Sequence, residues 1–214
     1  MADMPIVVEQ TAMLFFDTYN RGLHPKESQA QARIAASGVI PKMVRINQAC
    51  RDAGIPIFYA QADHRPDNKE FNAQVVDRRP ENVPAPANAE GPFRTVSPQV
   101  FSGTPEVEII PEIAPRPEDY VIKKHRWSAF FQTWLELALR ARGIDTIMLA
   151  GGGISAGVNA TAYAARDLGF HLIFLSDVIT PSSGPVREVT LKEIYPGFGR
   201  VRTVEEAIAL FQRR

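Results

Sequence analysis

Cysteine, net charge and long apolar runs are all scarce in this sequence, and each scarcity excludes a class of protein. Cys50 is the single cysteine of the 214 residues, which excludes an internal disulfide and a cysteine-based zinc site. The 24 basic side chains balance the 24 acidic ones, so the basic face that nucleic acids and membrane surfaces require is missing. No apolar run approaches the roughly 20 residues of a membrane span, and residues 1–10 lack the pattern of a signal peptide. We expect one cytoplasmic domain over residues 1–214, with a small molecule as its partner.

What the chain does contain is a series of short apolar runs typical of parallel strands that are buried on both faces. These runs are Thr11–Phe16, Ile55–Ala60, Asp119–Lys123, Thr146–Ala150, His171–Leu175 and a short one near Arg200–Arg202. Helical patterns lie between several of them, at Val39–Ala53, Thr133–Arg142, Gly157–Leu168 and Val204–Gln212. The last helix opens with Thr203 and Glu206 at the spacing of a capping box. This alternation predicts an α/β fold with three layers, α/β/α, around a doubly wound, mostly parallel six-stranded sheet.

Residues 65–118 differ from the rest of the chain, because they are rich in proline and show little periodicity. We interpret them as a long insertion over one edge of the sheet that covers the candidate site, since loops of this length are usually functional or disordered. The arginines of the insertion, Arg65, Arg78, Arg79 and Arg94, are candidates for pairing with a carboxylate of a substrate.

Polar residues follow the predicted strands at the point where ligands bind in such a sheet, beyond the carboxyl ends. Asp17 follows the first strand, Gln61 the second and Lys124 the third, and the fourth runs into the glycines at 151–153. Each has an ordinary structural alternative: a turn cap, a surface amide, a solvated lysine and a tight turn. Together they bring a carboxylate, an amide, an ammonium and backbone N–H groups to one rim. This combination favours a site for acid–base chemistry on an anionic ligand.

Residues 153–157 also spell the G-x-S-x-G motif of a serine nucleophile between a strand and a helix. That mechanism needs a later histidine, but His171 begins the next strand, beyond a helix about 18 Å long. His125, beside Lys124, leaves a serine mechanism open, although it comes in the wrong chain order for that fold. We expect Ser155 to bind substrate or to cap the helix.

Several segments resemble the isochorismatase-like hydrolases. Residues 12–17, Ala-Met-Leu-Phe-Phe-Asp, are similar to the opening strand and catalytic Asp of that family. Residues 124–130, Lys-His-Arg-Trp-Ser-Ala-Phe, are similar to its highly specific Lys-x-x-aromatic-Ser-Ala-Phe segment. Residues 143–162 resemble the segment around the nucleophilic cysteine of the family, and residues 198–206 resemble its C-terminal ending. The resemblance covers nearly the whole chain except the insertion. It implies the same fold, no cofactor, a non-proline cis peptide at Gly152–Gly153 and assembly into a homodimer or homotetramer.

The catalytic triad of the family, Asp, Lys and Cys, carries over only in part. Asp17 and Lys124 match it, whereas Gly157 stands at the cysteine position, as glycine does in the isochorismatases proper. Cys50 cannot substitute, because it lies on a packing face of the helix between the first two strands. Thioester chemistry is therefore excluded. The missing cysteine side chain leaves space, so that a bulkier group of the substrate is expected against Gly157.

We also expect no metal. Metal-binding relatives such as nicotinamidases carry an Asp-x-His pair after the second strand, whereas Asp63 and His64 are adjacent in this chain. Adjacent residues point apart in an extended chain, and no second histidine follows nearby in the sequence.

The isochorismatases proper also share Ala60-Gln61, and in them the Asp is a general acid on a vinyl ether while Lys and Gln hold the substrate. The resemblance implies a cysteine-independent hydrolase of this kind, with Asp17 as the acid and Lys124 binding a small anionic substrate. Burial raises the pKa of such an Asp and a nearby Lys lowers it, and the sequence leaves open which effect is larger. The expected contacts with the substrate are Tyr19, Gln61, Trp127, Phe130, Gly152, Gly153, Ser155 and Gly157. Trp127 and Phe130 are alternatively core aromatics.

Two alternatives remain. In the first, the substrate is an amide, imide or enamide, Asp17 activates a water molecule and N–H groups of the glycine run form an oxyanion hole. In the second, the chain is a non-catalytic homologue that binds a small molecule.

Overall fold

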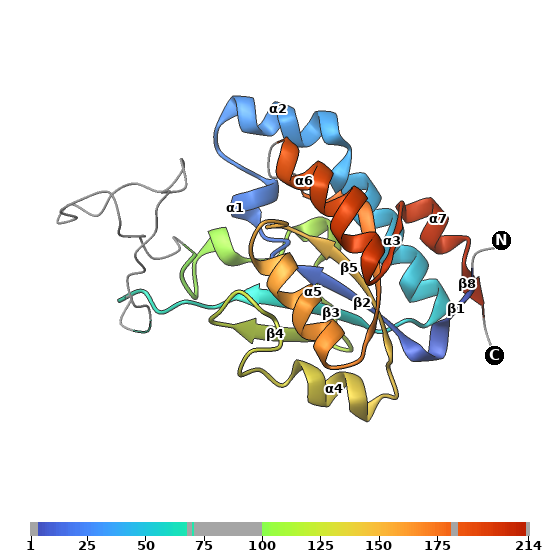
Figure 1. The fold of residues 1–214 in the computed structure, drawn as a ribbon. Helices are drawn as coiled ribbons and strands as arrows, with labels where there is room; N and C mark the ends of the chain where they lie inside the picture. Colours follow the sequence, from blue (N-terminus) through green and yellow to red (C-terminus); the bar gives the residue numbers. More distant parts are fainter. Residues whose placement is uncertain (1–3, 68–69, 71–99, 181–183, 213–214) are drawn as a thin grey trace.

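The computed structural model describes residues 4–67, 70, 100–180 and 184–212. Within these residues, six parallel strands form one sheet in the order β4–β3–β2–β5–β6–β7 (Figure 1). The strands are β2 (Thr11–Phe16), β3 (Ile57–Ala62), β4 (Tyr120–Lys124), β5 (Thr146–Gly151), β6 (His171–Ile179) and β7 (Arg200–Arg202). The predicted parallel α/β sheet is thus confirmed. The strand β3 begins later than predicted, because the N–H of Ile55 still closes the preceding helix on the carbonyl of Cys50 at 2.8 Å.

Side chains of β2 alternate between two apolar cores, one on each face of the sheet. Ala12, Leu14 and Phe16 join the first core, and Met13 and Phe15 join the second. The first core is covered by α4 (Leu135–Ala141) and α5 (Gly157–Asp167), and the second by α3 (Val39–Ala53) and α7 (Val204–Ile208). Figure 1 shows α5 and α3 on opposite sides of the sheet. These helices are the outer layers of the expected three.

The remaining elements are short, and the sequence patterns did not predict them. They are β1 (Ile6–Val7), η1 (Val8–Gln10), α1 (Asn20–Leu23), α2 (Ser28–Ser37), η2 (Pro105–Val107), η3 (Pro111–Ile113), α6 (Pro185–Val189), η4 (Thr190–Ile194), η5 (Tyr195–Gly197) and β8 (Phe211–Gln212). The longest of these helices, α2, has no fully buried residue, and the partly buried Ile34 packs against the second core. Among the described residues, no helix has both the length and the apolar character needed to cross a membrane.

The C-terminal helix is shorter than its pattern predicted, and it ends at Ile208. The predicted capping box is present: the N–H of Glu206 donates to the Thr203 hydroxyl, and the N–H of Thr203 donates to the Glu206 carboxylate. Beyond the helix, β8 pairs in parallel with β1 at the start of the chain. This non-local pairing withdraws the last predicted residues from the helix, which periodicity alone could not show.

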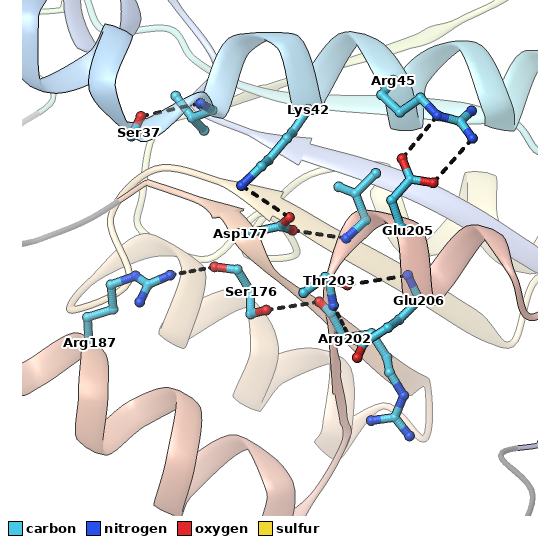
Figure 2. A network of polar contacts seen from close by, with 12 residues as sticks. Ser37, Lys42, Arg45, Ser176, Asp177, Arg187, Arg202, Thr203, Glu205 and Glu206 are labelled. Carbon is cyan, nitrogen blue, oxygen red and sulfur yellow. Dashed lines mark hydrogen bonds and ion pairs between the residues drawn. The ribbon is translucent and has the colours of Figure 1, made fainter.

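Polar contacts fix α3 and α7 against β6 at the edge of the second core (Figure 2). The ammonium of Lys42 lies 3.4 Å from the carboxylate of Asp177, which also accepts the N–H of Val204 at 2.9 Å. Arg45 donates two hydrogen bonds to Glu205, at 3.1 and 3.3 Å. These contacts belong to the scaffold, because Lys42 is paired with Asp177 and Arg45 with Glu205.

The C-terminal part of the insertion, residues 100–118, lies at the carboxyl ends of two interior strands, whereas the sequence suggested an edge of the sheet. The carbonyl of Val107 accepts the side-chain amide of Gln61 in β3 at 2.6 Å. The N–H of Ile110 donates at 3.0 Å to the carbonyl of the residue that follows Asp17. This part of the insertion therefore borders the loop that carries Asp17.

Candidate active site

The candidate site lies where the winding of the sheet reverses. From the central strand β2 the chain proceeds to β3 and β4 on one side, and to β5, β6 and β7 on the other. Ligands bind in α/β sheets at such a switch point, beyond the carboxyl ends of the strands. The N–H of Asp17 donates to the carbonyl of Ala60 at 2.9 Å, and the N–H of Gly152 donates to the carbonyl of Phe16 at 2.8 Å. The ends of β2, β3 and β5 are thus joined around Asp17.

Asp17 and Lys124 meet at this point, as strand-end reasoning predicted. The Lys124 ammonium lies 3.0 Å from Oδ1 of Asp17 and donates a hydrogen bond to Oδ2 at 3.2 Å. It also lies 4.3 Å from the centre of the Phe16 ring, a favourable position for a cation. The two side chains are only 19% and 5% exposed, so water screens their interaction weakly.

The Asp17 carboxyl is poised toward its protonated form. Burial raises its pKa, and this effect outweighs the opposing effects of Lys124, of a hydrogen bond from the backbone of Ala62 and of His64. The question that the sequence left open is therefore answered: the pKa of Asp17 is raised. Asp17 also has a φ of 49°, in the left-handed region that non-glycine residues rarely occupy. Such local strain is typical of functional positions.

The space beside Gly157 is filled, contrary to the expectation of a void. A Cβ atom built on Gly157 would lie 2.4 Å from Cζ and 2.5 Å from Cε1 of Phe16, and 3.3 Å from the carbonyl oxygen of Trp127. Phe16 is fully buried in the first core. The ring therefore occupies the place of a side chain at position 157, and a bulkier substrate group cannot lie there. Sequence reasoning missed the role of Phe16, because the residues next to it in the sequence do not show that its ring lies against position 157.

The glycine run is demanded by close backbone packing. Gly151 has a φ of 120°, and a Cβ atom there would lie 1.9 Å from the carbonyl oxygen of Phe16. The carbonyl of Gly153 accepts the N–H groups of Ala156 at 2.9 Å and of Val158 at 3.1 Å. Three N–H groups of this segment, including that of Gly152, are thus engaged by backbone carbonyls. The Gly152–Gly153 peptide is trans, so the implied cis bond is not found.

Ser155 lies in the turn before α5 and is exposed. The N-cap position of the helix is Ala156, without a side-chain cap, so Ser155 does not cap the helix. His171 is exposed at the start of β6, whereas Ser155 follows the end of β5. Because β5 and β6 are parallel, the two residues lie toward opposite ends of the sheet. The geometric argument against a serine nucleophile with His171 as its base is confirmed.

Four other residues were predicted to contact the substrate, and their surroundings differ. Tyr19 lies two residues after Asp17. Burial raises the pKa of its hydroxyl, and the nearby charge of Asp17 acts in the same direction. Gln61 is buried, with its amide nitrogen held by the insertion. Phe130 stacks on Phe170 with ring centres 5.7 Å apart, which is the core role left open for it. Trp127 is 66% exposed and is not a core aromatic.

Cys50 and Arg65 are held by packing and by an ion pair, respectively. Cys50 is fully buried in the second core, and burial raises the pKa of its thiol, as expected for a packing residue. Arg65 is held by Asp67 through hydrogen bonds of 2.9 and 2.7 Å. Arg78, Arg79 and Arg94 lie outside the described residues.

Sequence reasoning missed a cluster of His64, Glu70 and His125 beside the pair. His64 Nδ1 lies 2.8 Å from one carboxylate oxygen of Glu70, and His125 Nδ1 lies 3.5 Å from the other. His125 is far from His64 in the sequence, so that closeness in the sequence could not indicate this pair. The available signal was that both histidines follow the ends of neighbouring parallel strands, β3 and β4.

Comparison with known proteins agrees with this architecture. The isochorismatase domain model matches residues 11–206. The isochorismatase family protein YecD of Escherichia coli O157:H7 is 33% identical over 174 residues, 81% of this chain and 83% of that protein. The family protein YwoC of Bacillus subtilis is 46% identical over 99 residues, 46% of this chain, and the match spans 52% of that relative. Ureidoacrylate amidohydrolase RutB of Pseudomonas savastanoi pv. phaseolicola is 27% identical over 222 residues, 94% of this chain and 84% of that protein.

Two solved structures share the fold. A cysteine hydrolase from Pseudomonas syringae pv. phaseolicola superposes with a TM-score of 0.76 at 21% identity, over 97% of this chain and 95% of that one. N-carbamoylsarcosine amidase from Thermoplasma acidophilum gives a TM-score of 0.69 at 24% identity, over 92% and 97%. With the family model covering most of the chain, these matches show that the protein belongs to the isochorismatase family of hydrolases.

Proposed function

We propose that this hydrolase cleaves a vinyl or enol ether in a small anionic compound without forming a covalent enzyme intermediate. The observation that carries the proposal is the buried Asp17 carboxyl, with a raised pKa, in contact with Lys124. A carboxyl with a raised pKa keeps its proton to higher pH than an ordinary Asp, whose pKa is about 3.9, and in that form it can act as a general acid.

A nucleophile is not required for this reaction. Asp17 would donate its proton to the terminal carbon of the double bond, which leaves an oxocarbenium ion. Water then adds to that ion, and the resulting hemiketal releases the alcohol. The proton that the captured water loses can return to Asp17, so the reaction consumes one water molecule and restores the acid. The Phe16 ring beside Gly157 supports this choice, because it fills the place of a side chain there.

Lys124 would bind an anionic group of the substrate. Its ammonium is buried, 4% exposed, and lies 3.0 Å from the Asp17 carboxyl in the free protein. When a substrate anion pairs with Lys124, the negative charge of that anion lies near Asp17 and raises the pKa of the carboxyl further. Binding would thus favour the protonated form of the acid that the next step needs.

A second candidate reaction is hydrolysis of a C–N bond, with Asp17 as a base that activates water. It is favoured by the similarity to a relative named ureidoacrylate amidohydrolase. It is disfavoured by the engagement of three N–H groups of the glycine segment with backbone carbonyls, since those groups are not free to form an oxyanion hole.

The test is to incubate the pure protein with isochorismate, ureidoacrylate and a panel of small amides and enamides, and to follow the products by mass. Asp17→Asn and Lys124→Ala are compared with Asp63→Asn and Lys123→Ala. The controls remove the neighbouring acid–lysine pair, whose charged atoms lie 3.9 Å apart and whose lysine is 48% exposed.

Turnover of isochorismate that is lost in Asp17→Asn and retained in both control variants is the expected result. Turnover of amides or enamides alone would replace the first proposal by the second. Binding of a panel member without turnover, unchanged in Asp17→Asn, would leave only the non-catalytic binding role.

A further inference from the structure

Two histidines and a glutamate form a compact cluster at the rim of the site. One ligand atom of each of His64, Glu70 and His125 can be chosen so that all three lie within 4.8 Å of one another. His64 is buried, Glu70 is half-buried and His125 is 50% exposed, so the cluster is reachable from solvent on one side. Among the described residues, this is the one group of three such side chains at this spacing.

The sheet brings the two histidines together. Ala62 of β3 is aligned with Lys124 of β4, and the N–H of Asp63 donates to the Lys124 carbonyl at 3.0 Å. His64 and His125 therefore leave two neighbouring strands at the same level. The rings approach edge to face, with centres 6.3 Å apart.

Glu70 is fixed between the rings by contacts with the backbone. Its Oε1 atom accepts the N–H of Arg65 at 3.1 Å as well as the contact with His64. Its own carbonyl accepts a hydrogen bond from the Arg126 guanidinium at 3.1 Å. The second carboxylate oxygen faces His125. Ligands held in place by an outer shell of this kind are typical of metal centres.

We infer that His64, Glu70 and His125 bind a divalent transition metal ion, for which Zn²⁺ is the representative. Two imidazoles and one carboxylate are a donor set suited to such ions, and three protein ligands leave a position for water or a substrate anion. With bonds of about 2.0–2.2 Å, the ligand atoms of a tetrahedral ion lie roughly 3.4 Å apart, so donor atoms as far apart as 4.8 Å would have to approach, whereas the 2.8 Å contact of His64 with Glu70 would have to lengthen.

The charges around the cluster permit a cation. Lys124 opposes it, since its charge also acts to lower the pKa of His64. Asp63 adds a carboxylate near the end of β3, with the ammonium of Lys123 3.9 Å from it. The inference does not rest on which bond the enzyme cleaves, although a bound ion would lower the pKa of Asp17, as the charge of His64 does.

A plain ion pair that fastens the loop is the competing explanation, and the chain contains a matched control for it. His24 Nε2 lies 3.0 Å from Glu112 on another part of the surface. Among the described residues, no third histidine or carboxylate joins that pair in a metal-type group. A His–Glu contact alone is therefore present in both places, whereas the third ligand is present in only one.

The experiment is calorimetric titration of untagged, chelator-treated full-length protein with Zn²⁺, and with Mg²⁺ as a poor match for imidazole ligands. We expect one Zn²⁺ per chain and no saturable Mg²⁺ binding. His64→Ala, His125→Ala and Glu70→Gln should each weaken Zn²⁺ binding at least about tenfold, whereas His24→Ala should leave it unchanged. Co²⁺ should give the visible absorption of a bound ion in the wild type and lose it in His125→Ala. That variant alters an exposed side chain and should keep the wild-type melting temperature.

The inference is overturned if the wild type shows no saturable Zn²⁺ binding. It is equally overturned if His24→Ala weakens binding as much as His64→Ala, or if His125→Ala binds like the wild type.

Discussion

The substitution Gly157→Ala adds one methyl group at the position where the family carries its nucleophilic cysteine. In this protein the ring of Phe16 fills the space that the methyl group would need. The new Cβ atom would lie 2.4 Å from Cζ and 2.5 Å from Cε1 of Phe16. Carbon atoms in contact are about 3.5–4.0 Å apart, so the new Cβ atom would be too close to both of these ring atoms by about 1 Å or more. Phe16 is fully buried, and the ring cannot turn into solvent to avoid the methyl group.

Two opposing effects set the magnitude. Gly157 is the first residue of α5, where replacing glycine by alanine ordinarily stabilises by at most about 0.5–1 kcal/mol. Overpacking of a filled core costs about 1–3 kcal/mol. We therefore expect Gly157→Ala to lower the free energy of unfolding by about 1–2 kcal/mol. For a chain of this size that corresponds to a fall of about 2–8 °C in the melting temperature.

Urea and thermal unfolding followed by circular dichroism measure this change. The control is Gly22→Ala in α1, because a Cβ atom at Gly22 meets nothing within 4 Å and should not destabilise. The substitution Phe16→Leu removes both ring atoms involved, so Gly157→Ala should cost less in that background. An unchanged or raised stability of Gly157→Ala in the wild type, or an equal cost in both backgrounds, would refute the packing argument.

Four further outcomes follow from the same structure. Carboxyl carbon NMR should place the pKa of Asp17 above the ordinary Asp value, and Lys124→Met should raise it further by removing the opposing charge; a lowered pKa in the wild type would contradict the acid role. Because the folded-state pKa is raised, the Asp17 contribution to stability is present below the unfolded pKa and is lost as pH rises through the folded one. Denaturation across that range, compared with Asp17→Asn, checks the sign. Titration of a non-reactive anionic ligand in buffers of different ionisation enthalpy should show proton uptake, and none would argue against a coupled Asp17. Thr203→Ala should cost about 1 kcal/mol in urea unfolding through loss of the capping box, and a change within error would show that the cap is dispensable.

Local sequence signals predicted the elements whose limits are set locally. The helix α3 matches its prediction at both ends, because Gly54 in the left-handed conformation closes it as the sequence suggested. The strand β2 matches for a similar reason, since six buried residues bounded by polar ones leave little choice. By contrast, the end of α7 depends on the pairing of Phe211 with Ile6, a contact between opposite ends of the chain.

The candidate site divides in the same way. Asp17 follows the end of β2 and Lys124 is the last residue of β4, and the rule that parallel strands end on one rim places both without coordinates. The orientation of Phe16 and the meeting of His64 with His125 depend on register and packing. A shift of two residues in the register of β4 against β3 would separate the two histidines, although the pattern of the sequence would be the same.

Lys124 comes from β4, the outermost strand of the sheet, whereas Asp17 follows the central strand, and the two are 107 residues apart in the chain. Outer strands open locally at lower free energy than central ones, because fewer contacts hold them. Fraying of β4 would therefore withdraw the cation from Asp17 while the other five strands remain folded. The charge state of the acid is thus coupled to the dynamics of one sheet edge, and heating should alter the pH profile of this hydrolase before it melts the fold.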